Sequence, residues 1–198
     1  MGSYRSVPGL LLAIESLLKA RLPAELGLAS PVMGAVQLLS SADLKSIKDP
    51  GTGSLLGLWL HRISVDPTCR NAWQRPPPGS MQAARPVLPL NLHLMMMSWG
   101  NSVAAEIGLH AWGMQQLATT PVLDGSLVGA SDPDWGDDEE VQIAPEEVPT
   151  EDLMRIWDAL PVKYTLTTCW VVRTARVVME RDDADGLAQT RVFPVEAL

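Results

Sequence analysis

The segment Leu88–Gly100 reads L-P-L-N-L-H-L-M-M-M-S-W-G, and this stretch decides the fold. Its leucines recur at every second position and are continued by Met96, which places them on one face of a β-strand. The opposite face carries Asn91, His93, Met95, Met97 and Trp99. At about 3.3 Å per residue such a strand is about 40 Å long, which is long for a small domain.

Four other segments have the composition of strands. Residues 54–65 are apolar on both faces, which predicts a central strand in a sheet that is covered on both sides. Residues 164–179 alternate in the same way and predict the last strand, with Trp170 and Val172 on one face and Cys169 and Val171 on the other. Residues 32–39 and 141–144 predict short strands.

Three segments have helical spacing. Residues 10–22 repeat leucine and isoleucine every three or four positions, with Pro8 and Gly9 at the start and Pro23 after the end. Asn101 predicts the N-cap of a helix over 102–117, whose expected core stripe is Val103, Ile107, Ala111, Met114 and Leu117. Thr150 predicts the cap of a helix over 150–160 whose apolar stripe is Leu153, Ile156, Trp157 and Leu160.

These elements predict an α+β domain with a mixed sheet of four to five strands and about three helices. We expect one domain over residues 1–181, with a proline-rich arm over 66–89, an acidic loop over 131–140 and a flexible tail over 182–198. No internal repeat interrupts this organisation.

The chain is acidic, with a formal net charge of −8 in 198 residues. This charge argues against sequence-independent binding of nucleic acid and against docking on an anionic membrane. The apolar run at 10–14 is interrupted by Glu15 and lacks a cleavage site, so we expect a cytoplasmic protein without a signal peptide.

The sequence offers no motif for catalysis or for a cofactor. His61, His93 and His110 lack a metal-ligand partner at metal-binding spacing, and we interpret them as hydrogen-bonded residues at the edge of the core. Cys69 and Cys169 match neither a zinc motif nor a disulfide framework. A nucleophilic Cys169 would lie inside a strand, whereas an activated thiol needs a helix N-terminus or an electropositive cleft.

The remaining unusual residues predict contacts with other proteins. Trp73 and Trp135 lie in expected loops, where an indole either marks a contact or folds back over its own domain. Arg70, Arg75 and Arg85 concentrate positive charge in the arm of an acidic chain. The arm is thus a candidate for contact with a complementary patch on a neighbouring protein, and solubility is the alternative explanation.

The serial order of these features resembles the terminal cap family of contractile phage-tail-like injection systems. The resemblance covers about residues 4–179. It is carried by Arg70-Asn71, the proline-rich arm, the run P-L-N-L-H-L-M-M-M-S-W-G, the capped helix after it, the Thr-Pro-Val-Leu break at 120–123, the Leu-x-x-Ile-Trp-x-Ala-Leu helix at 153–160 and the closing strand. The acidic loop and residues 66–69 have no place in this pattern.

The resemblance implies a structural protein and not an enzyme. It implies a ring, expected to be a homohexamer, that ends the inner tube, contacts the tube and sheath proteins, and passes from the cytoplasm into the assembled particle. It also makes Arg70, Asn71 and the arm candidates for contacts with neighbouring subunits or with the tube. Two alternatives stay open: a neck or baseplate adaptor of such a particle, and a small-molecule-binding protein or thiol-dependent hydrolase.

Overall fold

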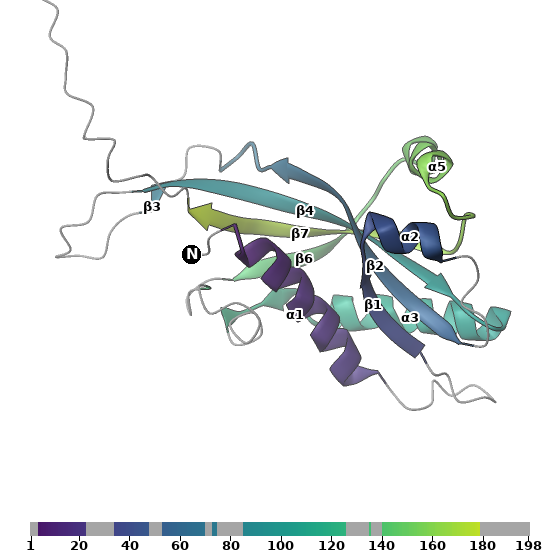
Figure 1. The fold of residues 1–198 in the computed structure, drawn as a ribbon. Helices are drawn as coiled ribbons and strands as arrows, with labels where there is room; N and C mark the ends of the chain where they lie inside the picture. Colours follow the sequence, from purple (N-terminus) through teal and green to yellow (C-terminus); the bar gives the residue numbers. More distant parts are fainter. Residues whose placement is uncertain are drawn as a thin grey trace, which may run out of the picture.

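The computed structural model describes residues 4–22, 34–47, 53–69, 73–74, 85–125, 135 and 140–178. These residues form a mixed sheet with helices on both faces, which confirms the predicted α+β class (Figure 1). In chain order the elements are α1 (Ser6–Arg21), β1 (Gly34–Leu39), α2 (Ser41–Ser46), β2 (Ser54–Val65), β3 (Trp73–Gln74), β4 (Arg85–Trp99), α3 (Val103–Thr119), β5 (Val122–Leu123), β6 (Val141–Glu146), α5 (Thr150–Ala159) and β7 (Thr167–Val178).

The sheet is built around β4, the strand that the sequence predicted most clearly. Its described strands number seven, in the order β1-β2-β4-β7-β6-β5, with β3 paired to the start of β4. The expected four to five strands were too few because β3 and β5 have only two residues each and leave no periodic pattern. β1 runs parallel to β2, and every other pairing is antiparallel.

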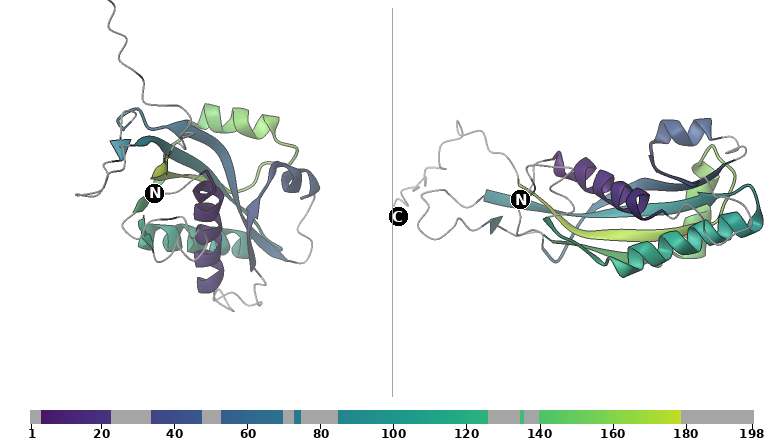
Figure 2. Two further views of the ribbon diagram at one scale, coloured as in Figure 1. Left: turned by 60° about the vertical axis from the view of Figure 1, so that its left-hand side comes forward. Right: turned by 90° about the horizontal axis from the view of Figure 1, so that it is seen from below.

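Each face of the sheet has its own core. On one face, Leu10 and Ile14 of α1 and Leu109 of α3 pack against even-numbered β4 residues such as Leu94 and Met96. On the other face, α2 and α5 pack against Met95 and the odd-numbered β4 residues. The left view of Figure 2 shows α1 and α3 on one side of the strands and α2 and α5 on the other. Coverage of both faces explains why β2 is apolar over residues 55–60 and β4 over residues 94–97.

Three predicted helix starts shift by one or more residues. The N-cap of α3 is Ser102 rather than Asn101, because the Ser102 hydroxyl accepts the hydrogen bond from the Ala105 amide at 3.2 Å. Thr150 is the first residue of α5 rather than its cap, which is Pro149. α1 begins at Ser6, so Pro8 lies inside its first turn, where a missing amide proton is tolerated.

The predicted core stripe of α3 is wrong except at Leu117. Val103 is 76% exposed and Ile107 is 54% exposed, and Ala111 and Met114 are exposed as well. The face that packs against the sheet instead holds Ala105, Leu109, His110, Gly113 and Leu117. The cause is close packing: a Cβ atom on Gly113 would lie 2.8 Å from a methyl carbon of Leu56 on β2. The helix therefore approaches the sheet closely at Gly113, and Val103, Ile107 and Met114 face outward.

Candidate contact surfaces

The titratable side chains are the groups that would carry any chemistry. Among the described residues, no group of three or more His, Cys, Asp or Glu side chains is arranged to hold a metal ion. Cys169 is buried in β7, and burial, aided by the nearby Glu146 carboxylate, raises the pKa of its thiol to about 11. A thiol in this state is protonated at neutral pH, which argues against the thiol-dependent hydrolase.

A polar cluster lies on the α2–α5 face, beyond the part that these helices cover. His93 of β4 is buried, and its Nδ1 lies 2.8 Å from the Glu146 carboxylate of β6. Its Nε2 lies 2.8 Å from the Ser64 hydroxyl of β2, and Arg62 of β2 lies 3.3 Å from the same Glu146 carboxylate. A carboxylate accepts hydrogen bonds, so Nδ1 donates to Glu146, and Nε2 shares a hydrogen bond with the Ser64 hydroxyl.

The Ser64–His93–Glu146 distances are those of a hydrolytic triad, but the setting is structural. Ser64 lies within a paired strand, directly opposite Asn91, so its own amide is committed to the ladder and unavailable to an oxyanion. The cluster joins β2, β4 and β6, which are not all neighbours in the sheet. It therefore links three strands through side-chain hydrogen bonds, which agrees with the hydrogen-bonding role predicted for His93.

The other two histidines are also inward-facing. His110 of α3 is buried, its Nδ1 lies 3.0 Å from the Ser98 hydroxyl, and desolvation lowers its pKa. His61 lies on β2, where a register shift between Leu60 and Arg62 marks a β-bulge. Desolvation is the largest cause of its lowered pKa, and the Glu146 carboxylate partly opposes that shift. Both rings are therefore neutral at physiological pH.

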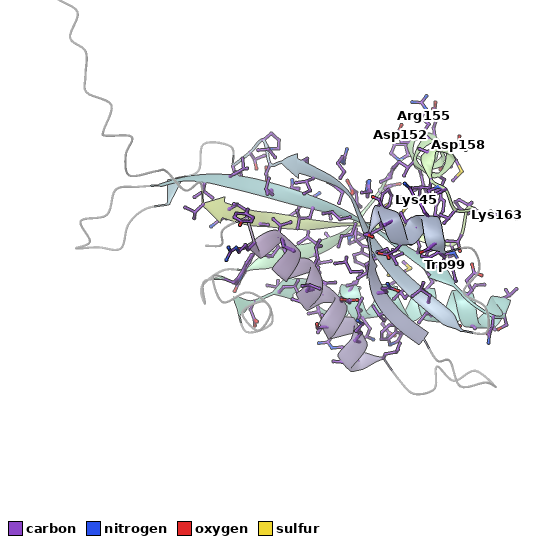
Figure 3. All side chains as sticks on the ribbon, viewed as in Figure 1. Lys45, Trp99, Asp152, Arg155, Asp158 and Lys163 are labelled. Atoms are coloured by element: carbon purple, nitrogen blue, oxygen red, sulfur yellow. The ribbon has the colours of Figure 1, made fainter. Side chains whose placement is uncertain are left out.

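α5 presents charge to solvent. Leu153, Ile156 and Trp157 pack toward the sheet, as predicted. Figure 3 shows Asp152, Arg155 and Asp158 projecting from the outer side of this helix, and Arg155 forms ion pairs with Asp152 and Glu151. Such exposed pairs within one helix stabilise little, so this side of α5 is a solvated surface.

Two apolar surfaces are exposed on the described residues. The first is the outer stripe of α3, formed by Val103, Ile107, Ala111 and Met114. The second is the distal part of β2, where Ile63 is 49% exposed and Val65 is 43% exposed. β1 ends at Leu39, opposite Trp59, so β2 continues past it with no described strand on that side. The α3 stripe was missed because the sequence periodicity assigned it to the core.

The predicted contact residues lie at one end of the sheet or outside the described residues. The backbone of Trp73 belongs to β3 and that of Arg85 to β4, and β3 pairs with β4 at the end of the sheet that no helix covers (Figure 1). Arg70, Asn71 and Arg75 lie outside the described residues, as do most of the acidic loop and the tail beyond Val178.

Trp135 corrects one prediction. Its side chain is only 5% exposed and belongs to the core cluster on the α1–α3 face. The indole therefore folds back over its own domain, which was the alternative to a contact role. A loop sequence rich in aspartate and glycine hides this from a reading of composition alone, because a single tryptophan can anchor such a segment to the core.

Comparison with known proteins assigns the chain to a family. The family model described as the Pvc16 N-terminal domain matches residues 10–191. The chain belongs to this family. The match confirms the resemblance to the terminal cap family, and no protein with a curated description matches the sequence.

Two solved structures share the fold of this Pvc16 N-terminal domain. One is the sheath/tube terminator of PVC, an extracellular contractile injection system, in its extended state, with a TM-score of 0.60, 16% identity and coverage of 97% of this chain. The other is the tube-terminating cap of the anti-feeding prophage, with a TM-score of 0.57, 14% identity and coverage of 96% of this chain. The chain spans only 61% and 58% of those two proteins. No described helix is long and apolar enough to cross a membrane.

Proposed function

We propose that this chain is a structural cap that ends the inner tube of a contractile phage-tail-like injection particle and attaches the end of the sheath. The observation that carries the proposal is the shared fold, over nearly the whole chain, with two proteins described as a sheath/tube terminator and a tube-terminating cap. Membership of the Pvc16 N-terminal domain family points the same way. Such a role is structural and not enzymatic.

The cap acts as a homohexameric ring in this proposal, with the tube protein and the sheath protein as its partners. A ring needs the same two surfaces on every subunit and requires no cleft. The protonated Cys169 and the strand-bound Ser64–His93–Glu146 cluster agree with a protein that does no chemistry. Subunits assemble in the cytoplasm and leave as part of the particle.

The contact residues are proposed to be Arg70, Asn71, Trp73, Arg75 and Arg85. Two of them, Trp73 and Arg85, lie where the sheet extends beyond its helices, and such an end can reach a neighbour without moving the core. The three arginines present positive charge to partners, and arginine suits interface ion pairs because its planar guanidinium binds carboxylates with two hydrogen bonds.

The proposal is tested in cells that produce the particle but lack this chain. Electron microscopy is expected to show tubes and sheaths of uncontrolled length, tubes without sheath, or no particles. Expression of the wild-type chain restores uniform particles, and a chain with Arg70, Arg75 and Arg85 replaced by glutamate does not. Normal, extended and contractile particles in the absence of the chain would exclude the cap function.

A further inference from the structure

The distal edge of β2 is open. β1 pairs with β2 only from Ser54 to Trp59, whereas β2 continues to Val65. Beyond Trp59 the described residues place no strand against this edge. A run of unpaired backbone groups of this kind is a template for another strand.

The hydrogen-bond ladder fixes which groups are free. The Asp66 amide donates to the Pro89 carbonyl at 3.0 Å, and the register continues with Ser64 opposite Asn91. In an antiparallel ladder alternate residues point their backbone groups at the partner strand. Ile63 and Val65 therefore direct their amide and carbonyl groups away from β4, toward the open side.

This edge lacks most of the features that protect edge strands from pairing. Residues 62–65 contain neither proline nor lysine, and Ile63 and Val65 are large apolar residues that are about half exposed. The one charge, on Arg62, is engaged with Glu146 on the opposite face of the strand. The bulge at His61 lies near the start of the open edge, and the register with β4 is regular from Arg62 to Val65.

We propose that a second copy of this chain adds its β3 end to the open edge of β2, so that the sheets of neighbouring subunits become continuous. The proposal rests on the ring assembly proposed above. β3 pairs with Arg85 and Pro86 at the start of β4. Its other edge has no strand partner among the described residues. Because β3 and the β2 edge are different surfaces, their contact is head-to-tail, the kind of contact that forms a ring when the rotation between subunits closes.

Charge favours a second copy as the occupant. The sequence from residue 67 to residue 86 contains Arg70, Arg75 and Arg85 and no Asp or Glu, so it carries a charge of +3. The whole chain carries −8, so the remainder carries −8 − 3 = −11. These opposite charges favour contact between copies, and Asp66 directly follows the β2 edge.

Cysteine cross-linking between copies tests the contact. In the full chain with Cys69→Ser, and with the buried Cys169 left in place, one sample carries Val65→Cys and a second carries Gln74→Cys. When the two are mixed and oxidised, we expect a disulfide-linked dimer of the two different variants. In the matched control, a sample that carries Ile107→Cys on the exposed α3 stripe takes the place of the Val65→Cys sample and is mixed with the Gln74→Cys sample. This mixture is expected to yield at least tenfold less disulfide-linked dimer.

A second pair of variants tests the backbone directly. Ile63→Pro removes one outward amide while leaving the β2–β4 ladder intact, since proline is tolerated where the N–H faces away from its partner strand. We expect a loss of at least tenfold in the affinity between subunits, measured by native mass spectrometry over a range of concentrations. The control Ile63→Thr keeps the amide and is expected to stay within about threefold of wild type.

The outcomes separate this inference from the cap function. The edge contact would be overturned if rings form but the two cysteine variants do not cross-link. It would also be overturned if rings of the Ile63→Pro variant are as stable as rings of the Ile63→Thr variant. Neither result would affect the proposed cap function. The same result follows if Val65→Cys in whole particles links to a tube or sheath protein instead. A chain that stays monomeric yet binds tube ends would overturn the second-copy contact, and one that does neither would overturn both proposals.

Discussion

The orientation of α3 gives the sharpest test of the packing. Leu109 is fully buried against the sheet, whereas Ile107, two residues earlier, is 54% exposed. Two residues correspond to about 200° around a helix, so the two side chains point in nearly opposite directions. Leu109→Ala should destabilise the chain by about 2 to 5 kcal/mol, the usual range for a buried leucine. Ile107→Ala removes less than half as much buried surface and should cost about 1 kcal/mol or less.

Urea unfolding of the monomer, followed by tryptophan fluorescence, measures both values. The slope of unfolding free energy against urea should be the same for wild type and both variants, which shows that the compared states are the same. Met114→Ala, on the same exposed stripe as Ile107, serves as a second control and should behave as Ile107→Ala does. Equal losses for Leu109→Ala and Ile107→Ala, or a larger loss for Ile107→Ala, would refute the described orientation of the helix.

Three further predictions follow from single residues. At pH 8 a pKa of about 11 leaves about one Cys169 thiol in a thousand as thiolate. Iodoacetamide should therefore modify Cys169 at least a hundredfold more slowly in the native chain than in the unfolded chain. Comparable rates in the two states would contradict the burial of Cys169. The pKa of His110 is lowered in the folded state, so the unfolded chain takes up the proton first and stability falls as the pH drops below about 6.5. Urea titrations at pH 7, 6 and 5 should show a shallower fall for His110→Gln, and identical pH profiles would show that this ring does not contribute. Gly100→Ala should lower the free energy of unfolding by about 2 kcal/mol or more, because the added Cβ would lie 2.5 Å from the Glu106 backbone nitrogen. Gly113→Ala would meet only flexible side chains and should change that free energy by about 1 kcal/mol or less. A lower melting temperature for Gly113→Ala than for Gly100→Ala would contradict the packing.

The main strands could be predicted from sequence because their pattern survives burial. β4 keeps its alternation from Leu88 to Met96, and β2 and β7 show the same two-sided apolar character. Each of these strands has a neighbour on both sides over part of its length, and helices cover both faces of the sheet there, so apolar side chains are needed on both faces. In these three strands the sequence pattern therefore matches the burial of the side chains in the fold.

The predictions failed where an element packs through small residues. α3 approaches the sheet through Ala105 and Gly113, and a hydrophobicity pattern weights larger residues such as Val103 and Ile107 more heavily. Hydropathy alone does not show that a glycine allows close approach. Trp135 was misplaced for a related reason, since the surrounding acidic residues outweigh one buried indole in any local average.

The candidate site was less predictable than the fold. The open edge of β2 arises because β1 stops at Leu39 while β2 runs on to Val65, and the pairing of two strands distant in sequence sets this difference. The Ser64–His93–Glu146 cluster likewise assembles residues from three strands. Neither feature has a local sequence signal. The arginines of the arm, in contrast, could be identified directly from composition.

The position of the chain in the particle is the central claim, and gold labelling tests it most directly. A small affinity tag at the C-terminus, labelled with gold on purified extended particles and viewed by electron microscopy, reports where the protein lies. The account predicts one cluster of label per particle, at the end of the tube opposite the baseplate. Label along the sheath, at the baseplate end, or on no particle at all would contradict it.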